Sequence, residues 1–482
     1  MHHNSRLQGV RRGIEAIIPD FSEDSGKIFA ILIALAFAAL ALSRIFAVLS
    51  SGVPIGYDFG LYKHAFELHA SQFPNIYSSA IPQWYVAWTP IGMYLVADLI
   101  SLTGLKPADY MTPLIIILEL LAAVAVYFCA KEYFGKKAAV FSLLFFCLSM
   151  VQFKVFEYFY LKNILGILLL FAALCFMKKR QAIPLVISAG LLAGIHRPTF
   201  LVFAACFAAY FFINAKDWKR NLLAGAGMLA FVLLFYWNSF QSSIIDMIFS
   251  GISVSGNFLD FTAFLSLSVW YWPFAVIALA MLFWKRQSLE IAVPAVILLI
   301  ITLFQIIFYN RFLIHLDLLF ILIAGIGFSA FLASIGSKEL RFLFFAFVAL
   351  SAAFAVFTVP VWELETISRP ELDFITHIKD ITEPDASILV TAPEYSTWVL
   401  GFSGRNAICP GFSDQDKWSE AQWQEFWDTE SPQEAIKMLS VYKKPLYIFT
   451  GDKTVIEGSK FNDPCFEDVA GFGYTWLVKV KC

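Results

Sequence analysis

Long apolar segments, separated by short polar loops, follow one another from about residue 28 to residue 360. A helix of about 20 apolar residues crosses the hydrocarbon core of a bilayer. The pattern predicts membrane-spanning helices near 28–49, 111–130, 138–153, 163–177, 183–195, 199–214, 221–237, 262–284, 290–308, 312–334 and 341–359. Beyond residue 360 the chain becomes polar, and this part is predicted to form a soluble α/β domain.

The segment at 84–102 is apolar enough to span a membrane, but it contains Pro90 and Asp98. Clusters of lysine and arginine fall in every second loop, around Lys131, Lys178, Lys216, Lys285 and Lys338. The positive-inside rule places those loops in the cytoplasm. With the N-terminus and the first cluster both inside, one of 84–102 and 111–130 must be non-spanning or re-entrant. We predict about eleven spans, or thirteen if a crossing in 58–110 is missed, with the C-terminal end outside.

The composition also indicates an α-helical polytopic membrane protein, because 59% of the residues are hydrophobic and only 15% are charged. A net charge of -2 gives no footprint for a nucleic-acid partner. No small-residue cleavage site follows the first apolar segment, so 28–49 is predicted to be a retained span. We divide the chain into a cytoplasmic N-terminus (1–27), a membrane module (28–360) with a long outer loop at 50–83, and an extracytoplasmic domain (361–482).

In the soluble domain, the residue pattern predicts helices near 371–380 and 419–440 and strands at 387–390, 446–449 and 474–479. Three cysteines, Cys409, Cys465 and Cys482, lie in this domain. Two of them could form a disulfide if the domain faces an oxidising compartment. Because three is an odd number, the pairing stays open.

The first candidate for chemistry is Asp58, which lies between two glycines in the first outer loop and opens a helix-like run. A carboxylate there could act as a general base toward an acceptor hydroxyl, or bind a divalent cation such as Mg²⁺ or Mn²⁺. The alternative is a helix N-cap, which would explain the aspartate without any chemistry. His64, in the same run, is a candidate for substrate binding.

A second outer loop carries Glu157 and Lys162. Lys162 could hold a phosphate as a point charge, and Glu157 is included as a substrate-binding candidate. The alternative for Lys162 is a lysine at the membrane interface that extends its ammonium into water. We favour that alternative for Lys154.

A sharp turn between two predicted spans contains His196, Arg197 and Pro198. Proline is common in the first turn of a helix, so this turn places both polar side chains at the membrane surface. Arginine offers a bidentate fork to phosphate, which lysine lacks. A polar hairpin cap is the competing interpretation.

The sharpest case is the run from Asn310 to Asp317, where Arg311 joins two very apolar segments and His315 and Asp317 lie within the second. Burying such groups in a membrane is costly unless they pair or face a wet cavity. His315 is one helical turn from Arg311, so both can face the same cavity. An Arg311–Asp317 pair is the alternative, although their spacing does not place them on one helix face.

The overall arrangement resembles the GT-C superfamily of integral membrane glycosyltransferases. The resemblance rests on Asp58 in the first outer loop, on the Tyr-Phe-Gly-Lys-Lys run at 133–137, and on Asn310, Arg311 and Phe312 at the start of a late span. It implies a donor sugar on a polyprenyl phosphate and a lipid, glycan or protein acceptor. It further implies that Asp58 is the base or metal-site carboxylate, and that Arg311, with Arg197 or Lys162, holds the lipid-linked phosphate.

The tail is also similar to the soluble domain of oligosaccharyltransferase catalytic subunits, through the run at 392–398 followed by 404–406. This chain lacks that family's Trp-Trp-Asp-Tyr-Gly motif, has one aspartate at residue 58 instead of Asp-x-Asp, and has no acidic end on its 253–256 motif. A single-sugar transferase of the protein mannosyltransferase or aminoarabinose transferase type therefore fits better than an oligosaccharyltransferase. The membrane would be the plasma membrane of a prokaryote or the endoplasmic reticulum of a eukaryote.

A transporter or a flippase of lipid-linked glycans is the alternative from another functional class. Transporters tend to have interrupted helices in paired halves and ionisable groups at mid-membrane. Here the polar residues gather at predicted outer helix ends, and no half-repeat is visible in the sequence.

Overall fold

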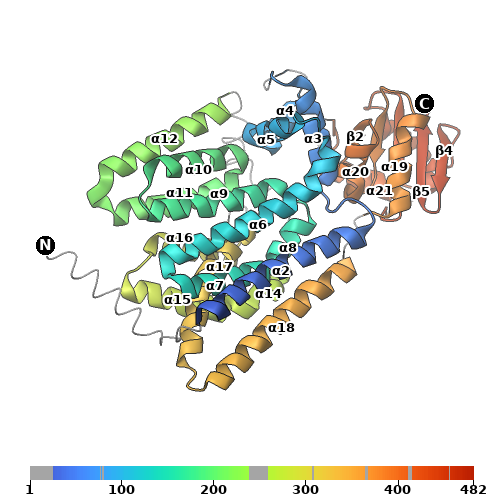
Figure 1. Ribbon diagram of the computed structural model, residues 1–482. Helices are drawn as coiled ribbons and strands as arrows, with labels where there is room; N and C mark the ends of the chain where they lie inside the picture. The colour runs from blue at the N-terminus through green and yellow to red at the C-terminus, as the bar shows by residue number, and fades with distance from the viewer. Residues whose placement is uncertain are drawn as a thin grey trace.

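The computed structural model describes residues 25–482 except 76, 77, 79, 80, 238–258, 307, 308, 364–366, 411–414, 455 and 457. Most of the predicted cytoplasmic N-terminus, and the 253–256 motif, therefore lie outside the described residues. A bundle of helices makes up the larger part of the molecule, and the C-terminal domain sits at one end of it (Figure 1). The predicted fold class, a helical membrane module followed by a small α/β domain, is confirmed.

Six helical segments in the described part of the chain are long and apolar enough to cross a membrane. They are α2 (Ser25–Ser51), α6 (Pro107–Phe134), α9 (Leu161–Lys178), α12 (Trp218–Tyr236), α14 (Phe261–Ser268) continued by α15 (Trp272–Lys285), and α17 (Tyr309–Ser334). The helix α17 packs against α15 and against α7 (Lys136–Cys147), in the centre of the bundle. The predicted total of eleven to thirteen spans stays a prediction.

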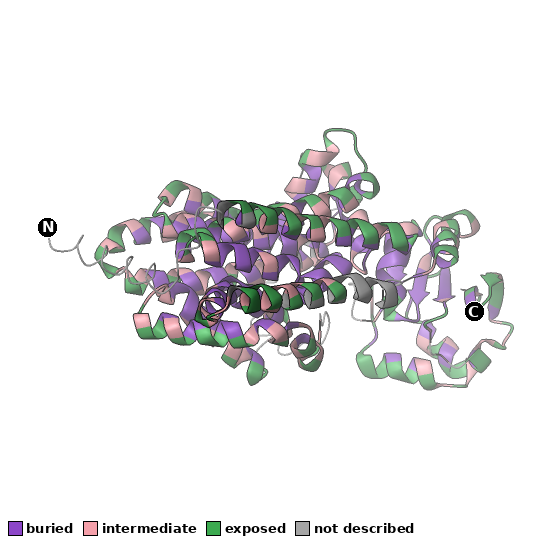
Figure 2. Cartoon of the chain, turned by 60° about the horizontal axis from the view of Figure 1, so that its bottom comes forward, coloured by how far each residue is buried: buried purple, intermediate pink, exposed green. Residues whose placement is uncertain are grey.

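Shorter apolar helices fill the spaces between the long ones. They are α5 (Ile91–Ser101), α10 (Ala182–Ile195), α11 (Arg197–Ile213) and α16 (Leu289–Leu303), and α18 (Lys338–Glu363) lies along the outside of the bundle. Large apolar side chains such as Leu35, Phe212 and Trp284 are exposed on outer helix faces, and Figure 2 shows this exposed outer surface around a buried interior. Such a surface is suited to lipid, so the chain is an integral multi-pass membrane protein.

The ambiguous segment at 84–102 does not form one helix. It is divided at Thr89 and Pro90 into α4 (Gln83–Trp88) and the eleven-residue α5. Eleven helical residues reach only about half of a hydrocarbon core. Of the two alternatives raised by the sequence, 84–102 is therefore the non-spanning segment and α6 is the spanning one.

The predicted span at 138–153 is apolar and long enough to cross a membrane, but it is not one continuous helix. It is divided into α7 and α8 (Met150–Glu157), which bend by 47° at the break between them. Ser149 lies at this break, and its hydroxyl accepts a hydrogen bond from the backbone N–H of Gln152 at 3.2 Å. A serine that caps a new helix start in this way favours an interruption of the apolar run.

Among the described residues of the membrane module, Arg44 and Lys154 each form an enclosed ion pair. Arg44 on α2 contacts Glu119 on α6, with its Nε 2.7 Å from Oε2, and its guanidinium lies over the rings of Phe153 and Phe156. The second pair joins Lys154 to Glu157, at 2.8 Å. Lys154 is buried, so the prediction that it extends into water is wrong.

The C-terminal domain contains a five-stranded sheet in the order β2-β1-β3-β5-β4. Parallel pairing joins β1 (Ser387–Val390) to β2 (Asn406–Ile408) and to β3 (Leu446–Thr450). Strand β5 (Thr475–Val480) pairs antiparallel with both β3 and β4 (Phe466–Phe472). The helices are α19 (Arg369–Ile381), α20 (Ser396–Phe402), α21 (Glu420–Asp428) and α22 (Pro432–Leu439).

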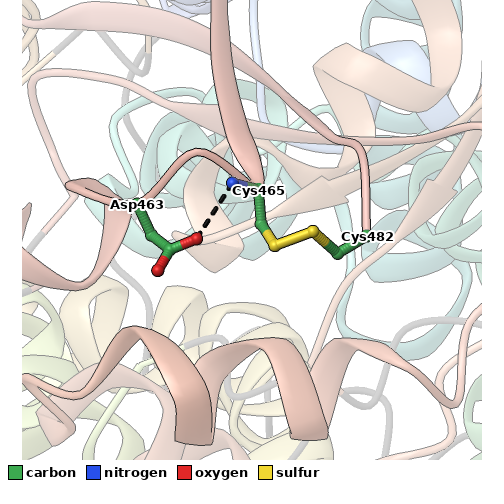
Figure 3. The surroundings of a disulfide bond; sticks show 3 residues. All are labelled: Asp463, Cys465 and Cys482. Carbon is green, nitrogen blue, oxygen red and sulfur yellow. Dashed lines mark hydrogen bonds between the residues drawn. A yellow bond between two sulfur atoms is a disulfide. The ribbon is translucent and has the colours of Figure 1, made fainter.

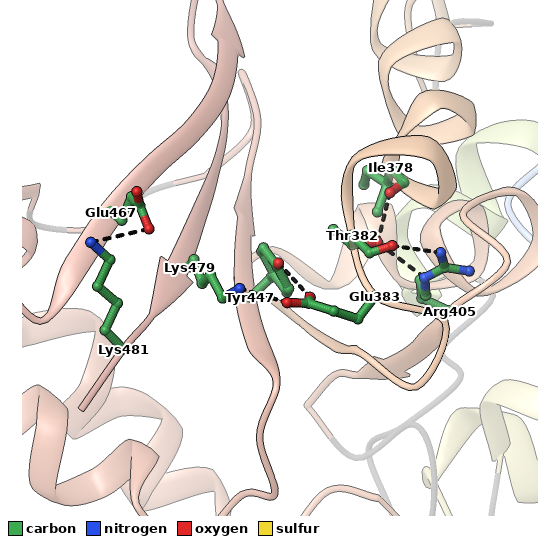
Figure 4. Close-up of polar contacts among 8 residues, drawn as sticks. All are labelled: Ile378, Thr382, Glu383, Arg405, Tyr447, Glu467, Lys479 and Lys481. Carbon is green, nitrogen blue, oxygen red and sulfur yellow. Dashed lines mark hydrogen bonds and ion pairs between the residues drawn. The ribbon is translucent and has the colours of Figure 1, made fainter.

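A disulfide between Cys465, which directly precedes β4, and Cys482 links the two ends of the β4–β5 hairpin (Figure 3). Cys409 is buried and free. At the same end of the strands, Glu383 accepts hydrogen bonds from Lys479 and Tyr447, both at 2.6 Å (Figure 4). These two donors lower the pKa of Glu383 to about 2. The negative charge of Glu383 at this end of the sheet is thus satisfied by donors of the same domain.

The C-terminal domain docks onto the first outer loop through α20 and α3 (Phe59–Gln72). The Thr397 hydroxyl donates to the carbonyl of Tyr57, and the Tyr57 hydroxyl donates to the carbonyl of Pro393 at 2.9 Å. Lys63 donates to the carbonyl of Gly401 at 2.8 Å. These contacts join the two parts of the molecule beside Asp58.

Candidate active site

Asp58 occupies the N-cap position of α3 but does not cap the helix. Its backbone is helical, with φ -77° and ψ -5°, and its side chain accepts no hydrogen bond from the helix. A capping aspartate normally has an extended backbone, which brings its oxygen to the free N–H groups of the first turn. The N-cap interpretation therefore explains where Asp58 lies but not what its carboxylate does.

The loop that carries Asp58 is held against the turn between α8 and α9. The backbone N–H of Asp58 donates to the carbonyl of Tyr158 at 3.2 Å. Gly56 has φ +92°, and a Cβ at that position would lie 2.7 Å from the carbonyl oxygen of Glu157. Phe159 also has a left-handed backbone, with φ +61°. Strained backbone of this kind concentrates at functional sites.

Lys162, at the start of α9, is fixed by neutral groups. Its ammonium donates to the carbonyl of Trp88 at 3.0 Å and approaches the hydroxyl of Thr89 at 3.2 Å. It also lies 3.9 Å from the centre of the Trp88 ring, which is a favourable cation–π distance. The ammonium of this partly buried lysine is thus directed toward protein groups and not into water.

The charges of Asp58 and Lys162 act on each other. Burial raises the pKa of the Asp58 carboxyl to about 7, and the nearby positive charge of Lys162 opposes that shift. Asp58 is therefore a carboxyl group that can exchange a proton near neutral pH, which is the property required of a general base.

Arg197 and Arg311 bring two further positive charges to the same place. Arg197 is the first residue of α11, and Arg311 lies in the first turn of α17. Both are close enough to Lys162 to interact with it electrostatically, and both Arg311 and Asp58 act on Tyr160. The structure thus brings three predicted site cations, from three helices, near one another, and one of them, Lys162, acts directly on Asp58.

His196 and His315 lie beside these cations and are linked by Thr199. The Thr199 hydroxyl is 2.6 Å from Nδ1 of His196 and 2.7 Å from Nε2 of His315. The Nδ1–H of His315 donates to the carbonyl of Arg311 at 3.0 Å. All three side chains are buried.

Asp317 belongs to a separate, closed network. Its carboxylate accepts hydrogen bonds from the Tyr271 hydroxyl, from Gln152 Nε2 at 2.6 Å and from the Ser149 hydroxyl at 3.1 Å. These neutral donors, and not Arg311, satisfy Asp317. The alternative of a structural Arg311–Asp317 pair is therefore wrong.

The remaining predicted residues are engaged elsewhere. Glu157 pairs with Lys154, and the ring of His64 lies 6.0 Å from that of Tyr85. Burial and the charge of Lys63 lower the pKa of His64 to about 4. Neither Glu157 nor His64 forms a hydrogen bond or ion pair with Asp58 or Lys162 in the described part of the chain. Asn310 directly precedes Arg311 at the start of α17.

Three residues of this site were not predicted as part of it: Trp88, Thr89 and Thr199. Trp88 and Thr89 lie in the apolar segment that Pro90 interrupts. A broken apolar segment in a membrane protein exposes backbone carbonyls that can bind a cation. Thr199 lies in the turn of His196 and Arg197. A hydroxyl three residues from a buried histidine was the available signal.

The Mg²⁺ or Mn²⁺ ion considered from the sequence stays a prediction. Mg²⁺ is usually held by one or two carboxylates, with waters and substrate phosphates as its other ligands. No group of three or more His, Cys, Asp or Glu side chains in the described residues is arranged to hold a metal. The charged groups that accompany Asp58 are cations, and their repulsion disfavours a divalent ion.

The fold matches that of solved membrane glycosyltransferases. The archaeal oligosaccharyltransferase AglB from Archaeoglobus fulgidus superposes with a TM-score of 0.61 at 13% sequence identity, over 89% of this chain and 70% of AglB. ArnT from Cupriavidus metallidurans superposes with a TM-score of 0.59 at 14% identity, over 95% of this chain and 98% of ArnT. No family model and no curated protein matches the sequence. The chain has the GT-C fold that the sequence resemblance predicted.

Proposed function

We propose that this protein is a membrane glycosyltransferase that moves a sugar from a polyprenyl-phosphate donor to a lipid, glycan or protein acceptor. One observation carries the proposal: the Asp58 carboxyl lies near Lys162, which in turn lies close to Arg197 and Arg311. A base beside several cations is the arrangement needed to activate a hydroxyl next to a leaving phosphate.

The ligands of proteins that share the fold support the proposed donor. AglB was solved with a dolichol-phosphate and an inhibitory peptide, and ArnT was solved with undecaprenyl phosphate, at a TM-score of 0.55 to this chain. Both lipids carry a phosphate on a polyprenyl chain. The cations of this chain, at the ends of apolar helices, are suited to such a headgroup.

In the proposed reaction, the ionised Asp58 removes the proton from an acceptor hydroxyl. The hydroxyl oxygen then attacks the anomeric carbon of the donor sugar, and the bond from that carbon to the phosphate oxygen breaks. The carrier phosphate leaves with an added negative charge. Arg311, Arg197 and Lys162 stabilise this charge, and the bidentate fork of an arginine suits phosphate particularly well. No step is assigned to a metal ion.

We further propose that the site and the C-terminal domain lie on the extracytoplasmic side. The Cys465–Cys482 disulfide supports this orientation, because disulfides persist in oxidising compartments. The membrane would be the plasma membrane in a prokaryote and the endoplasmic reticulum in a eukaryote.

The test is transfer of radiolabelled sugar by the purified protein, from a panel of polyprenyl-phosphate sugars to membrane extract. Asp58→Asn should lower the transfer rate by about 10²–10⁴-fold, the usual contribution of a general base, and should leave donor binding nearly unchanged. The matched control is Asp260→Asn, because Asp260 does cap its helix, accepting from the N–H of Ala263 at 2.7 Å.

Asparagine caps helices as well as aspartate does, so Asp260→Asn should keep full activity. If Asp58→Asn is equally active, Asp58 is not the base. If the wild-type protein binds none of the donors, the transferase proposal fails, and transport assays in liposomes would follow.

A further inference from the structure

The two buried histidines of the site form a continuous hydrogen-bonded chain through one threonine. His196 Nδ1 lies 2.6 Å from the Thr199 hydroxyl, which lies 2.7 Å from His315 Nε2. The two imidazole rings are nearly parallel, at 16°, with their centres 6.1 Å apart. Thr199 itself is fully buried. Its hydroxyl therefore has the two imidazoles as its partners.

The direction of each hydrogen bond follows from the carbonyl of Arg311, at which this series of hydrogen bonds ends. A carbonyl oxygen only accepts, so His315 must carry its proton on Nδ1 to donate to Arg311. A neutral His315 then has a lone pair on Nε2, and the Thr199 hydroxyl donates to it. Thr199 has no second proton, so its oxygen accepts from Nδ1–H of His196. Both imidazoles are thus fixed as neutral Nδ1–H tautomers.

The surrounding charges favour the neutral form of both rings. The positive charges of Lys162, Arg197 and Arg311 all reach His196. A protonated imidazole would add a further cation to an already cationic, buried region, which is unfavourable. The charges of the site and the tautomers of the chain therefore agree.

The chain connects the helix starts that carry the two arginines. His196 directly precedes Arg197 at the start of α11, and His315 accepts from Thr199 while it donates to the carbonyl of Arg311 in α17. Gly166 of α9 allows this approach, because a Cβ there would lie 3.1 Å from the Cβ of His196 and 3.3 Å from the Thr199 hydroxyl. Gly166 is one helical turn from Lys162, so the chain lies next to the third cation.

We propose that Thr199 is a positioning residue that holds Arg197 and Arg311 at the spacing required to bind one phosphate between them. The inference rests on the proposed function, because the phosphate is that of the polyprenyl carrier. Thr199 does not touch the donor. It acts by fixing the orientation of His196 and His315, and through them the first turns of α11 and α17.

The experiment measures binding of undecaprenyl phosphate and of dolichyl phosphate to the purified protein in detergent. Thr199→Val keeps the shape of the side chain but removes its hydroxyl, and should weaken binding by about tenfold, as expected when a buried hydrogen-bonded link is lost. Thr199→Ser restores the hydroxyl and should bind within about twofold of the wild type. In transfer assays, Thr199→Val should raise the KM for the donor and leave kcat nearly unchanged.

The matched control is Thr302→Val. Thr302 is also a fully buried threonine of the membrane module, but its hydroxyl makes no hydrogen bond among the described residues. This variant should bind the carrier like the wild type. If Thr199→Val also binds like the wild type while Arg311→Lys binds weakly, the positioning role is overturned and the proposed function stands. If the wild type binds neither carrier, both fail.

A second measurement is made on the wild-type protein, and a variant serves only to assign a signal. Nitrogen-15 NMR of histidine-labelled wild-type protein distinguishes the two tautomers of a neutral imidazole, and His196→Asn assigns its signal. Both His196 and His315 should be protonated at Nδ1 alone. A signal from either residue that shows an Nε2–H proton would contradict the proposed hydrogen-bonded link through Thr199.

Discussion

Arg44 and Asp58 represent two ways of placing charge inside this protein. The Arg44 guanidinium is matched by one carboxylate, that of Glu119, and is enclosed by Phe153 and Phe156. Asp58 acts instead on Lys162, which also interacts with Arg197 and Arg311 and donates its own hydrogen bonds to neutral oxygens. The first arrangement is complete without a ligand, whereas the second has more positive than negative charge among these four residues.

This difference separates structural from functional charge in a membrane protein. A buried ion must be paired or must face something that will pair with it, because the apolar surroundings offer no water. Where the pair is complete, as in Arg44–Glu119, the expected role is packing. Where the cations exceed the carboxylates, an anionic ligand is the natural complement. Changes to Arg44, to Arg311 and to the pH should have successively smaller effects on the protein.

The largest effect is expected from breaking the closed pair. Arg44→Met leaves Glu119 buried without its partner, which should destabilise the fold by about 3–5 kcal/mol. Thermal unfolding in detergent measures this loss. The double variant Arg44→Met with Glu119→Leu replaces both charges and should recover most of the stability, since buried pairs exchanged for apolar residues are often neutral. A double variant as unstable as the single one would contradict a purely structural role.

An intermediate effect is expected from Arg311→Lys. Lysine keeps the positive charge but loses the bidentate fork, so binding of the polyprenyl-phosphate donor should weaken by about tenfold while thermal stability stays the same. The control is Arg220→Lys, which changes an arginine that pairs with Asp217 in one of the predicted cytoplasmic clusters. Unchanged donor affinity in Arg311→Lys would remove that residue from the site.

The smallest effect is expected from pH alone. Because the pKa of Asp58 is raised to about 7, the fraction able to accept a proton falls as the pH decreases through that value. The transfer rate at saturating donor should therefore be about half of its maximum at a pH equal to the pKa. The donor is a phosphodiester and does not titrate in this range. A rate that is constant between pH 5 and 8 would show that another group is the base.

Apolar patterning predicted most of the helices because each long apolar run must be buried or face lipid. The soluble domain was also predictable where strands are continuous apolar runs: 387–390 was predicted and β1 is Ser387–Val390. The division of 138–153 at Ser149, the three-residue strand β2 and the mostly exposed seven-residue strand β4 were not predicted. A single polar residue in an apolar run and a three-residue strand carry too little periodicity to be recognised.

The candidate site was predicted residue by residue, but its connections were not. Asp58, Lys162 and Arg311 each stood out as polar groups at the ends of apolar segments. That Trp88 fixes Lys162, and that Thr199 joins the two histidines, depends on contacts between distant segments of the chain. Sequence periodicity reports which face of a helix is buried, but it carries no information about which other helix covers that face.

The docking of α20 onto α3 has a consequence for how the protein matures. The Asp58 loop is synthesised early, whereas Thr397 and Pro393, which hold Tyr57, are made more than 330 residues later. A nascent chain can therefore insert its helices and expose Asp58 long before the loop is fixed. The site is completed only when the last quarter of the polypeptide has folded against the Asp58 loop. A prematurely terminated product would therefore lie in the membrane with an unassembled site.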